Sequence, residues 1–458
     1  MPASVFRAIP SRRLPLALLL SLSFAGASQA QSLVEIYDMA KGYDASYQAA
    51  RAQYEANLAK ADQGKAQLLP QVGLSAGATR AQRTQDPQTT TSNFSYTTQT
   101  AGINATQPLY RPANLATYRQ SQKSLELAQA ALSQADQDLI VRVSQAYFDV
   151  LTAQDSLAFV QAQKAAVAEQ LASAKRNFEV GTATITDTRE AQARFDLVIA
   201  QEIAAENTLR VTNVYLEQLV GKTGLKPQRI RTGSALPAAD GQSIENWISL
   251  SEQAHPAIQQ SRANLEIAKL ETEKATAVHK PTLDFSLGYN TTKNFTGTQI
   301  GPLLPAAGFP NGTSQINIAS AGIAFNLPLY AGGATQNRVR ETTALEEKAR
   351  LDLEGAQRQV AQATRTAYLG LQSGLGQVKA YEAAEASSQV ALDANKLGYQ
   401  VGVRINIDVL NSQSQLFQTK RDLAKARYDV LVGQLKLRQA AGVLKAEDLQ
   451  PLNQLLAP

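Results

Sequence analysis

The feature of this sequence that most limits its fold is a repeat that covers almost the whole chain. Phe178-Glu179-Val180-Gly181 returns as Tyr399-Gln400-Val401-Gly402, 221 residues later. Other residues keep the same offset: Tyr147 and Tyr368, Asp187 and Asp408, Gln192 and Gln413, and Gly221 and Gly442. A register that holds over this length indicates a tandem duplication, in which one structural unit is built twice.

The repeat divides the chain into a few parts. After a short N-terminal segment we predict a first repeat over residues 31–222, a linker over 223–243, a second repeat over 244–442 and a tail over 443–458. Pro70 matches Pro281 at an offset of 211, whereas Pro108 matches Pro328 at 220. The second copy therefore carries about nine additional residues between these landmarks.

Each repeat is predicted to contain a helix, a β-hairpin, a long helix and another helix, in that order. Within the helices apolar residues recur at spacings of three and four, the coiled-coil period. The predicted ranges are 33–69, 71–107, 112–178 and 187–220 in the first repeat, and 244–280, 282–327, 334–399 and 408–441 in the second. At 1.5 Å per residue the long helix measures roughly 100 Å, and the two shorter helices placed end to end match it.

The hairpins are predicted from a two-residue alternation of apolar and polar side chains. Alternation of this kind gives a strand one apolar and one polar face. The apolar positions are Val72, Leu74, Ala76 and Ala78; Ala101, Ile103 and Ala105; Leu283, Phe285, Leu287 and Tyr289; and Ala319, Ala321, Ile323, Phe325 and Leu327.

The first thirty residues are predicted to be a secretory signal peptide. Three arginines precede an apolar run over 14–24, and Ala27-Ser28-Gln29-Ala30 provides the small residues of a cleavage site. Removal of this segment leaves 41 basic and 39 acidic residues, so charge gives no argument for nucleic-acid binding. We expect an exported chain.

The composition excludes several kinds of chemistry. Among 458 residues there is no cysteine, which excludes thiolate nucleophiles, disulfides and a lipid-anchoring cysteine. The two histidines, His255 and His279, are too far apart for zinc-ligand spacing. Gly221-Lys222-Thr223 lacks the first glycine of a phosphate loop and reads as a helix C-cap, and Trp247 reads as a packing anchor. We predict neither an enzyme nor a cofactor or metal site.

The strands are the only segments suited to crossing a membrane. No stretch after the signal peptide reaches the roughly 18 apolar residues of a membrane helix. An open four-stranded sheet cannot stand alone in lipid, because closure of a barrel needs about eight strands or more, and three copies would supply twelve. Tyr110 and Tyr330, next to the strands, suit a membrane interface. The alternative is a soluble hairpin on a non-channel periplasmic coiled-coil scaffold or adaptor.

In order and spacing the motifs resemble the TolC-like outer membrane efflux protein family across essentially the whole mature chain. The segments that carry the resemblance are 178–181, 186–187, 327–333, 399–410 and 424–428. The resemblance implies a fold that is mainly α with transmembrane β: a trimeric 12-stranded β-barrel, continuous with a long α-helical coiled-coil barrel.

The resemblance also implies a function and a set of partners. A homotrimer in the outer membrane of a Gram-negative bacterium would give passive exit across the periplasm, gated at its periplasmic turns. It would contact outer membrane lipid, a periplasmic adaptor (membrane fusion) protein and an inner-membrane ABC or proton-driven transporter. Drug efflux and type I protein secretion are not distinguished by these residues.

The turns after the long helices carry the candidate working residues. Gly181 and Gly402 stand where a left-handed helix cap is expected. Asp187 is expected to begin the next helix, with Glu190 at capping-box spacing, and capping alone would explain it. For Asp408 a threefold axis would make a ring of three carboxylates, suited to selectivity and gating.

By resemblance, Tyr399, Arg404 and Asp408 fall at the periplasmic entrance of the family, with Thr186 and Asp187 on the facing turn. The resemblance implies that Tyr399 and Arg404 bond to Thr186 and Asp187 and hold the coils inward, and that opening breaks these bonds.

One residue departs from the best-known family pattern. That pattern has a second acid three positions after the first, where this chain has Asn411. A ring of three charges in place of six should weaken cation selectivity.

Overall fold

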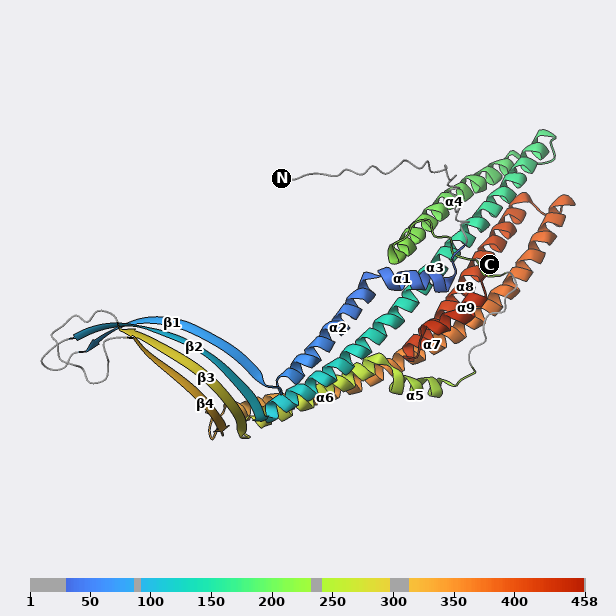
Figure 1. Ribbon diagram of the computed structural model, residues 1–458. Coiled ribbons are helices and arrows are strands. Elements are labelled where there is room, and N and C mark those ends of the chain that lie inside the picture. The colour runs from blue at the N-terminus through green and yellow to red at the C-terminus, as the bar shows by residue number, and fades with distance from the viewer. Residues whose placement is uncertain (1–29, 86–91, 232–240, 297–312, 457–458) are drawn as a thin grey trace, which may run out of the picture.

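The computed structural model describes residues 30–85, 92–231, 241–296 and 313–456. The predicted signal peptide, apart from Ala30, lies outside this range. In the described part, one sheet occupies one end of the molecule and the helices run away from it (Figure 1).

The order of elements repeats, as predicted. The first repeat contains α1 (Leu33–Tyr43), α2 (Ala45–Ala66), β1 (Gln71–Gln85), β2 (Ser92–Tyr110), α3 (Pro112–Glu179) and α4 (Ile185–Val220). The second contains α5 (Ile244–Ala254), α6 (Pro256–Ala277), β3 (Thr282–Thr296), β4 (Thr313–Asn326), α7 (Ala334–Gln400) and α8 (Asn406–Ala440), followed by a 3₁₀ helix (Ala446–Asp448) and α9 (Leu449–Gln454).

The sheet is antiparallel, with the order β1-β2-β3-β4. Leu74 pairs with Ile103, and their counterparts Phe285 and Ile323 pair with each other, so the repeat extends to the register of each hairpin. The two hairpins join through β2 and β3, where Ile103 pairs with Tyr289. Strands β1 and β4 remain as the edges of the sheet.

The alternation predicted for the strands gives the sheet an exposed apolar face. Leu74 on β1 is 80% exposed, and Ile323 and Phe325 on β4 are each 66% exposed. Large apolar side chains exposed in this number mark an interaction surface for a membrane or for another protein chain.

The single helices predicted over 33–69 and 244–280 are each two helices in the structure. Asp44 has a non-helical backbone and caps α2, because its carboxylate accepts a hydrogen bond from the Tyr47 N–H at 2.7 Å. In the second repeat Pro256 begins α6, and a proline disfavours helical geometry at the preceding residue, His255. Both breaks fall at equivalent positions, and the Pro256 signal was present in the sequence.

The main core lies beside the middle of the long helices, where α1, α9 and residues 226–230 pack on α3, α4 and α8 (Figure 1). We call α1, α5, α9 and residues 226–230 the belt. Tyr147 of α3 is fully buried there, and its hydroxyl donates to the carbonyl oxygens of Gln228 at 2.9 Å and Gln31 at 3.3 Å.

Residues 226–230 of the predicted linker and α9 of the predicted tail are packed parts of the belt. The Gln31 N–H donates to the Lys226 carbonyl at 2.8 Å, and Ile230 forms a β-bridge with Leu456. Leu449 and Leu452 of α9 are buried in the same core. Apolar residues at intervals of three and four were the signal that the tail has a packed side.

The belt and the long helices place the candidate turns far from the sheet. Both helical hairpins, α3–α4 and α7–α8, end at the same extremity of the molecule (Figure 1). With 68 residues in α3 and 67 in α7, the coils account for most of the length.

Candidate functional site

The turns after α3 and α7 have the same backbone. Gly181 and Gly402 have φ angles of 79° and 78°, as predicted for left-handed caps. The Thr182 N–H donates to the Asn177 carbonyl at 2.8 Å, and the Val403 N–H donates to the Gly398 carbonyl at 2.9 Å. These bonds satisfy carbonyl groups that the helix ends leave unpaired.

In the first turn Asp187 belongs to a capping box, but not to the one predicted. Helix α4 begins at Ile185 and its N-cap is Thr184. The Asp187 N–H donates to Thr184 Oγ1 at 3.2 Å, and the Thr184 N–H donates back to Asp187 Oδ2 at 2.9 Å. The predicted box of Asp187 with Glu190 is wrong by one turn, and the Thr-x-x-Asp spacing was visible in the sequence.

In the second turn no side chain caps the helix. The N-cap of α8 is Ile405, and Asp408 lies in the first helical turn, where the helix dipole favours a carboxylate. Asp408 Oδ2 lies 3.6 Å from Arg404 Nη1. Gly398 leaves room for this arginine, since a Cβ atom there would lie 2.7 Å from Arg404 Cγ.

The structure does not pair Tyr399 and Arg404 with Thr186 and Asp187 within the described chain. Tyr399 instead accepts a hydrogen bond from Asn177 Nδ2 at 3.3 Å, and Arg404 is held by its own turn. Thr186 is exposed. The predicted bonds are therefore absent from the contacts of a single chain.

The two turns are joined by a residue that the sequence analysis missed. Asn406 is fully buried, and its Nδ2 donates to the Asp187 carbonyl at 3.4 Å, while its Oδ1 accepts from Gln170 Nε2. Its counterpart in the first repeat is Ile185. A polar residue at a position that is apolar in the other copy was the available signal.

Asn411, which departs from the family pattern, also bonds across the repeats. Its Oδ1 accepts a hydrogen bond from Arg194 Nη2 of α4 at 2.7 Å. The neutral amide thus has a defined partner in the facing helix.

A cleft of about 720 Å³ lies between the turns. Asp187, Tyr399 and Arg404 line it together, so the structure brings these predicted residues to one site. Its charged lining residues are Glu169, Arg176, Asp187, Lys396 and Arg404. Bases outnumber acids in this lining, and the arrangement is suited to ion recognition more than to acid–base chemistry.

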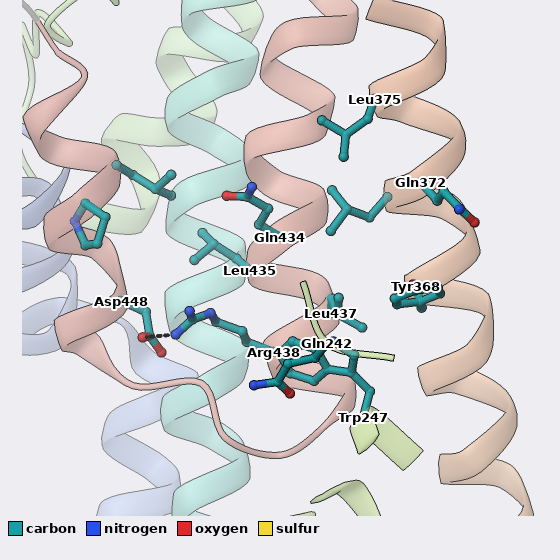
Figure 2. A pocket seen from close by; sticks show the side chains of 13 residues that line it. Gln242, Trp247, Tyr368, Gln372, Leu375, Gln434, Leu435, Leu437, Arg438 and Asp448 are labelled. Carbon is teal, nitrogen blue, oxygen red and sulfur yellow. Dashed lines mark hydrogen bonds and ion pairs between the residues drawn. The ribbon is translucent and has the colours of Figure 1, made fainter. Parts of the chain in front are cut away.

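A second pocket lies in the belt between α5, α7, α8 and α9 (Figure 2). Trp247 lies in its wall and is 4% exposed, which agrees with the predicted role as a packing anchor. The titratable residues in the lining, apart from Tyr368, are Arg438 and Asp448, which form an ion pair.

The described part of the chain also lacks the ligand clusters of a metal site. Residues 30–85, 92–231, 241–296 and 313–456 hold no group of three or more His, Cys, Asp or Glu side chains that could bind a metal. Among the same residues, every helix falls short of the length and apolar character that a membrane span needs.

A family model described as outer membrane efflux protein matches residues 36–222 and 247–443, one match on each repeat. The chain is 33% identical over 431 residues to outer membrane protein TolC of Vibrio cholerae, covering 94% of this chain and 95% of that protein. It is 31% identical over 431 residues to the alkaline protease secretion protein AprF of Pseudomonas aeruginosa, with 92% and 86% covered.

The fold has close counterparts among solved structures. The outer membrane protein VceC of Vibrio cholerae superposes with a TM-score of 0.74 at 20% identity, over 90% of this chain and 96% of that one. The structure of CusC superposes equally well, with a TM-score of 0.74 at 17% identity, over 90% and 92% of the two chains.

Proposed function

This chain belongs to the outer membrane efflux protein family, and from that membership we propose that it is the outer membrane channel-tunnel of an efflux or type I secretion system. It gives passive exit across the periplasm and the outer membrane to cargo that an inner-membrane transporter delivers through a periplasmic adaptor. The family match carries this proposal, because it covers the strands, coils and turns of both repeats.

The sheet supports assembly into a homotrimer. Its apolar face is exposed and its edge strands β1 and β4 are unpaired. Backbone groups in lipid must be hydrogen-bonded, so the sheet enters a membrane only if other copies close it. Three copies with four strands each form a barrel of twelve.

The repeat predicts how one copy meets the next. Strand β2 pairs with β3 inside the chain, and by repeat equivalence β4 pairs with β1 of the next copy. The pair Ile103–Tyr289 then becomes Ile323 of one copy beside Ala78 of the next. The absence of cysteine makes this register directly testable.

The test is a thiol cross-link between copies with a short bifunctional reagent. Ala78→Cys combined with Ile323→Cys should give a covalent trimer on denaturing gels. Leu74→Cys combined with Ile323→Cys is the matched control on the same face, displaced by four residues. Monomers from both variants, or stronger linking in the control, would refute the trimer register.

The channel itself is tested by location and conductance. We expect the mature protein in the outer membrane fraction, as a species whose gel migration changes on heating, with single-channel conductance in planar bilayers. Release as a soluble protein by osmotic shock would instead support a periplasmic scaffold or adaptor. Both efflux and protease secretion occur among the names of relatives, so the cargo follows from the transporter that this channel meets.

The gate lies at the turns, and Asp408 of the three copies forms its charged ring. Arg404, 3.6 Å away, offsets part of that charge. Asp408→Asn should therefore lower the ratio of cation to anion permeability, and Arg404→Gln should raise it. If both variants keep the ratio of the parent protein, the ring is wrongly assigned.

The closed state is held by contacts at the two turns, including Tyr399 and Asp187, with Thr186 exposed beside them. Asp187→Ala combined with Tyr399→Phe should raise the conductance of the closed channel. Thr184→Ala is the control, because it breaks the same capping box and keeps the carboxylate. An equal rise in the control would show that helix capping, not a latch, sets the conductance.

A further inference from the structure

The basic residues at the two ends of the sheet differ in whether they have partners. At the end next to the helices, Arg111 makes two hydrogen bonds to Asp284, from Nε at 2.7 Å and from Nη2 at 2.6 Å. At the far end, Arg80 and Lys293 are exposed. Neither has an ion pair or hydrogen bond to any residue that the structure describes.

Both free cations lie on the apolar face of the sheet, at its far margin. On β1 the apolar alternation runs from Val72 to Ala78 and the next position is Arg80. On β3 the apolar alternation ends at Tyr289, and Lys293 follows four residues later on the same face of the strand. The register places Thr97 beside Arg80, and Gln99 and Gln315 beside Lys293. We call Arg80, Thr97, Gln99, Lys293 and Gln315 the distal collar.

The distal collar offers hydrogen-bond donors and positive charge without a nearby acid. The four strands, 71–85, 92–110, 282–296 and 313–326, contain one acidic residue, Asp284. Asp284 lies at the opposite end of the sheet and forms an ion pair with Arg111. The sequence beyond β1 adds one acid, Asp86, and one base, Arg83, precedes it. Among the residues that the structure describes, Arg80 and Lys293 therefore have no counterion.

We propose that the distal collar binds the phosphate groups of lipid headgroups in the leaflet farther from the helices. The inference rests on the proposed function, because a lipid reaches the collar only when its acyl chains lie along the apolar face. Guanidinium and ammonium groups form charge-assisted hydrogen bonds with phosphate, and the exposed Gln99 amide adds a further donor, whereas Gln315 Nε2 donates to Thr291 and Asn317 within the sheet. In the trimer the collar is repeated three times around the barrel.

The experiment measures lipid A bound to the full-length protein in detergent, by native mass spectrometry. The lipid carries two phosphates, and the same lipid without phosphate is the comparison. Arg80→Gln combined with Lys293→Gln should weaken binding of the phosphorylated lipid about 30-fold, since each cation near a charged membrane surface contributes about 1 kcal/mol. The parent protein should lose affinity as salt is raised, and the variant should lose less.

The matched control removes two exposed cations from the middle of α7, through Arg365→Gln and Lys379→Gln. It makes the same change in net charge, far from the sheet, and should bind as the parent does. Equal weakening in the control, equal binding by the collar variant, or equal binding of the lipid without phosphate would overturn the proposal. Failure to assemble into heat-modifiable oligomers would instead refute the proposed function, since that assay needs no phosphorylated lipid.

Discussion

The two turns at the tips of the coils share one backbone and differ in how the next helix begins. In the first, Thr184 and Asp187 cap each other and the carboxylate is held inside its own turn. In the second, Ile405 cannot cap, and Asp408 faces Arg404 instead. In the first turn the carboxylate is therefore used to cap a helix, whereas in the second turn it is not bound to the backbone. The second turn is for this reason the better candidate for a gate.

In the belt, too, equivalent positions of the two repeats carry side chains with different contacts. Asp44 caps α2 in the first repeat and also pairs with Arg142 at 2.9 Å. Its counterpart His255 caps α6, where Nδ1 accepts the Ala257 N–H at 3.1 Å. Tyr147 is covered by the chain's own N-terminal segment and linker, whereas its counterpart Tyr368 lines a pocket (Figure 2). Equivalent positions keep the backbone and change the chemistry.

The largest difference between the copies is expected at the glycines that end α4 and α8. A Cβ atom on Gly442 would lie 2.3 Å from the His255 Cα, while one on Gly221 would meet the ring of Tyr43, which is 59% exposed and can move. Both have positive φ angles. Gly442→Ala should cost about 3 kcal/mol or more, and Gly221→Ala about 1–2 kcal/mol. Thermal unfolding by circular dichroism measures both, and equal losses would remove the distinction.

The next largest difference is expected between Tyr147, which is buried, and its partly buried counterpart Tyr368. Tyr147→Phe removes a hydroxyl that donates to two backbone carbonyl groups in the belt, so we expect a loss of about 1–2 kcal/mol. Tyr368 makes no side-chain hydrogen bond to the residues described, so Tyr368→Phe should stay within about 0.5 kcal/mol of the parent. Denaturant unfolding of the two variants tests this, and a larger loss at Tyr368 would contradict it.

The difference in helix capping at the two turns can be tested by removing the side-chain cap of α4 and by adding one to α8. Thr184→Ala should destabilise the protein by about 1 kcal/mol, because it removes the side-chain cap of α4. Ile405→Thr should gain up to about 1 kcal/mol, because Asp408 already stands where a capping box needs it. Thermal unfolding by circular dichroism measures both changes. A loss of stability in Ile405→Thr would show that the exposed isoleucine has a packing role.

The smallest difference concerns pH. Burial lowers the pKa of His255, so its neutral form is favoured in the folded state. The stability that this provides is complete above the unfolded pKa of about 6.5 and is lost as pH falls below it. His255→Asn keeps a capping acceptor without titrating, so its melting temperature should fall less between pH 7.5 and pH 5. The same fall in both proteins would exclude His255 as the cause.

Much of the fold was predictable from local patterns. The long helices were expected over 112–178 and 334–399 and are observed at 112–179 and 334–400. The four strands were expected from their alternation and are observed. The helix breaks at Asp44 and His255 were missed, because a short interruption does not disturb a periodicity that continues on both sides.

The site was predicted in its location but not in its contacts. Gly181 and Gly402 were placed correctly because a left-handed residue is a local requirement. The partner of Tyr399 was not predicted, since Asn177 lies 222 residues away in the sequence. The local partners of Asp187 and Arg404, Thr184 and Asp408, were also missed, because the resemblance pointed to contacts across the turns. Asn406, which joins the two turns, carries no motif of its own.

By itself the sequence determined the duplication, the order of elements, the lengths of the coils and the apolar face of the strands. These follow from periodicity and from turn residues, which act over a few positions. Only the tertiary structure decided that α9 and residues 226–230 close the belt, that Asn406 joins the two turns and that Tyr399 meets Asn177. Those outcomes depend on packing between distant segments, where differences of about 1 kcal/mol select one partner over another.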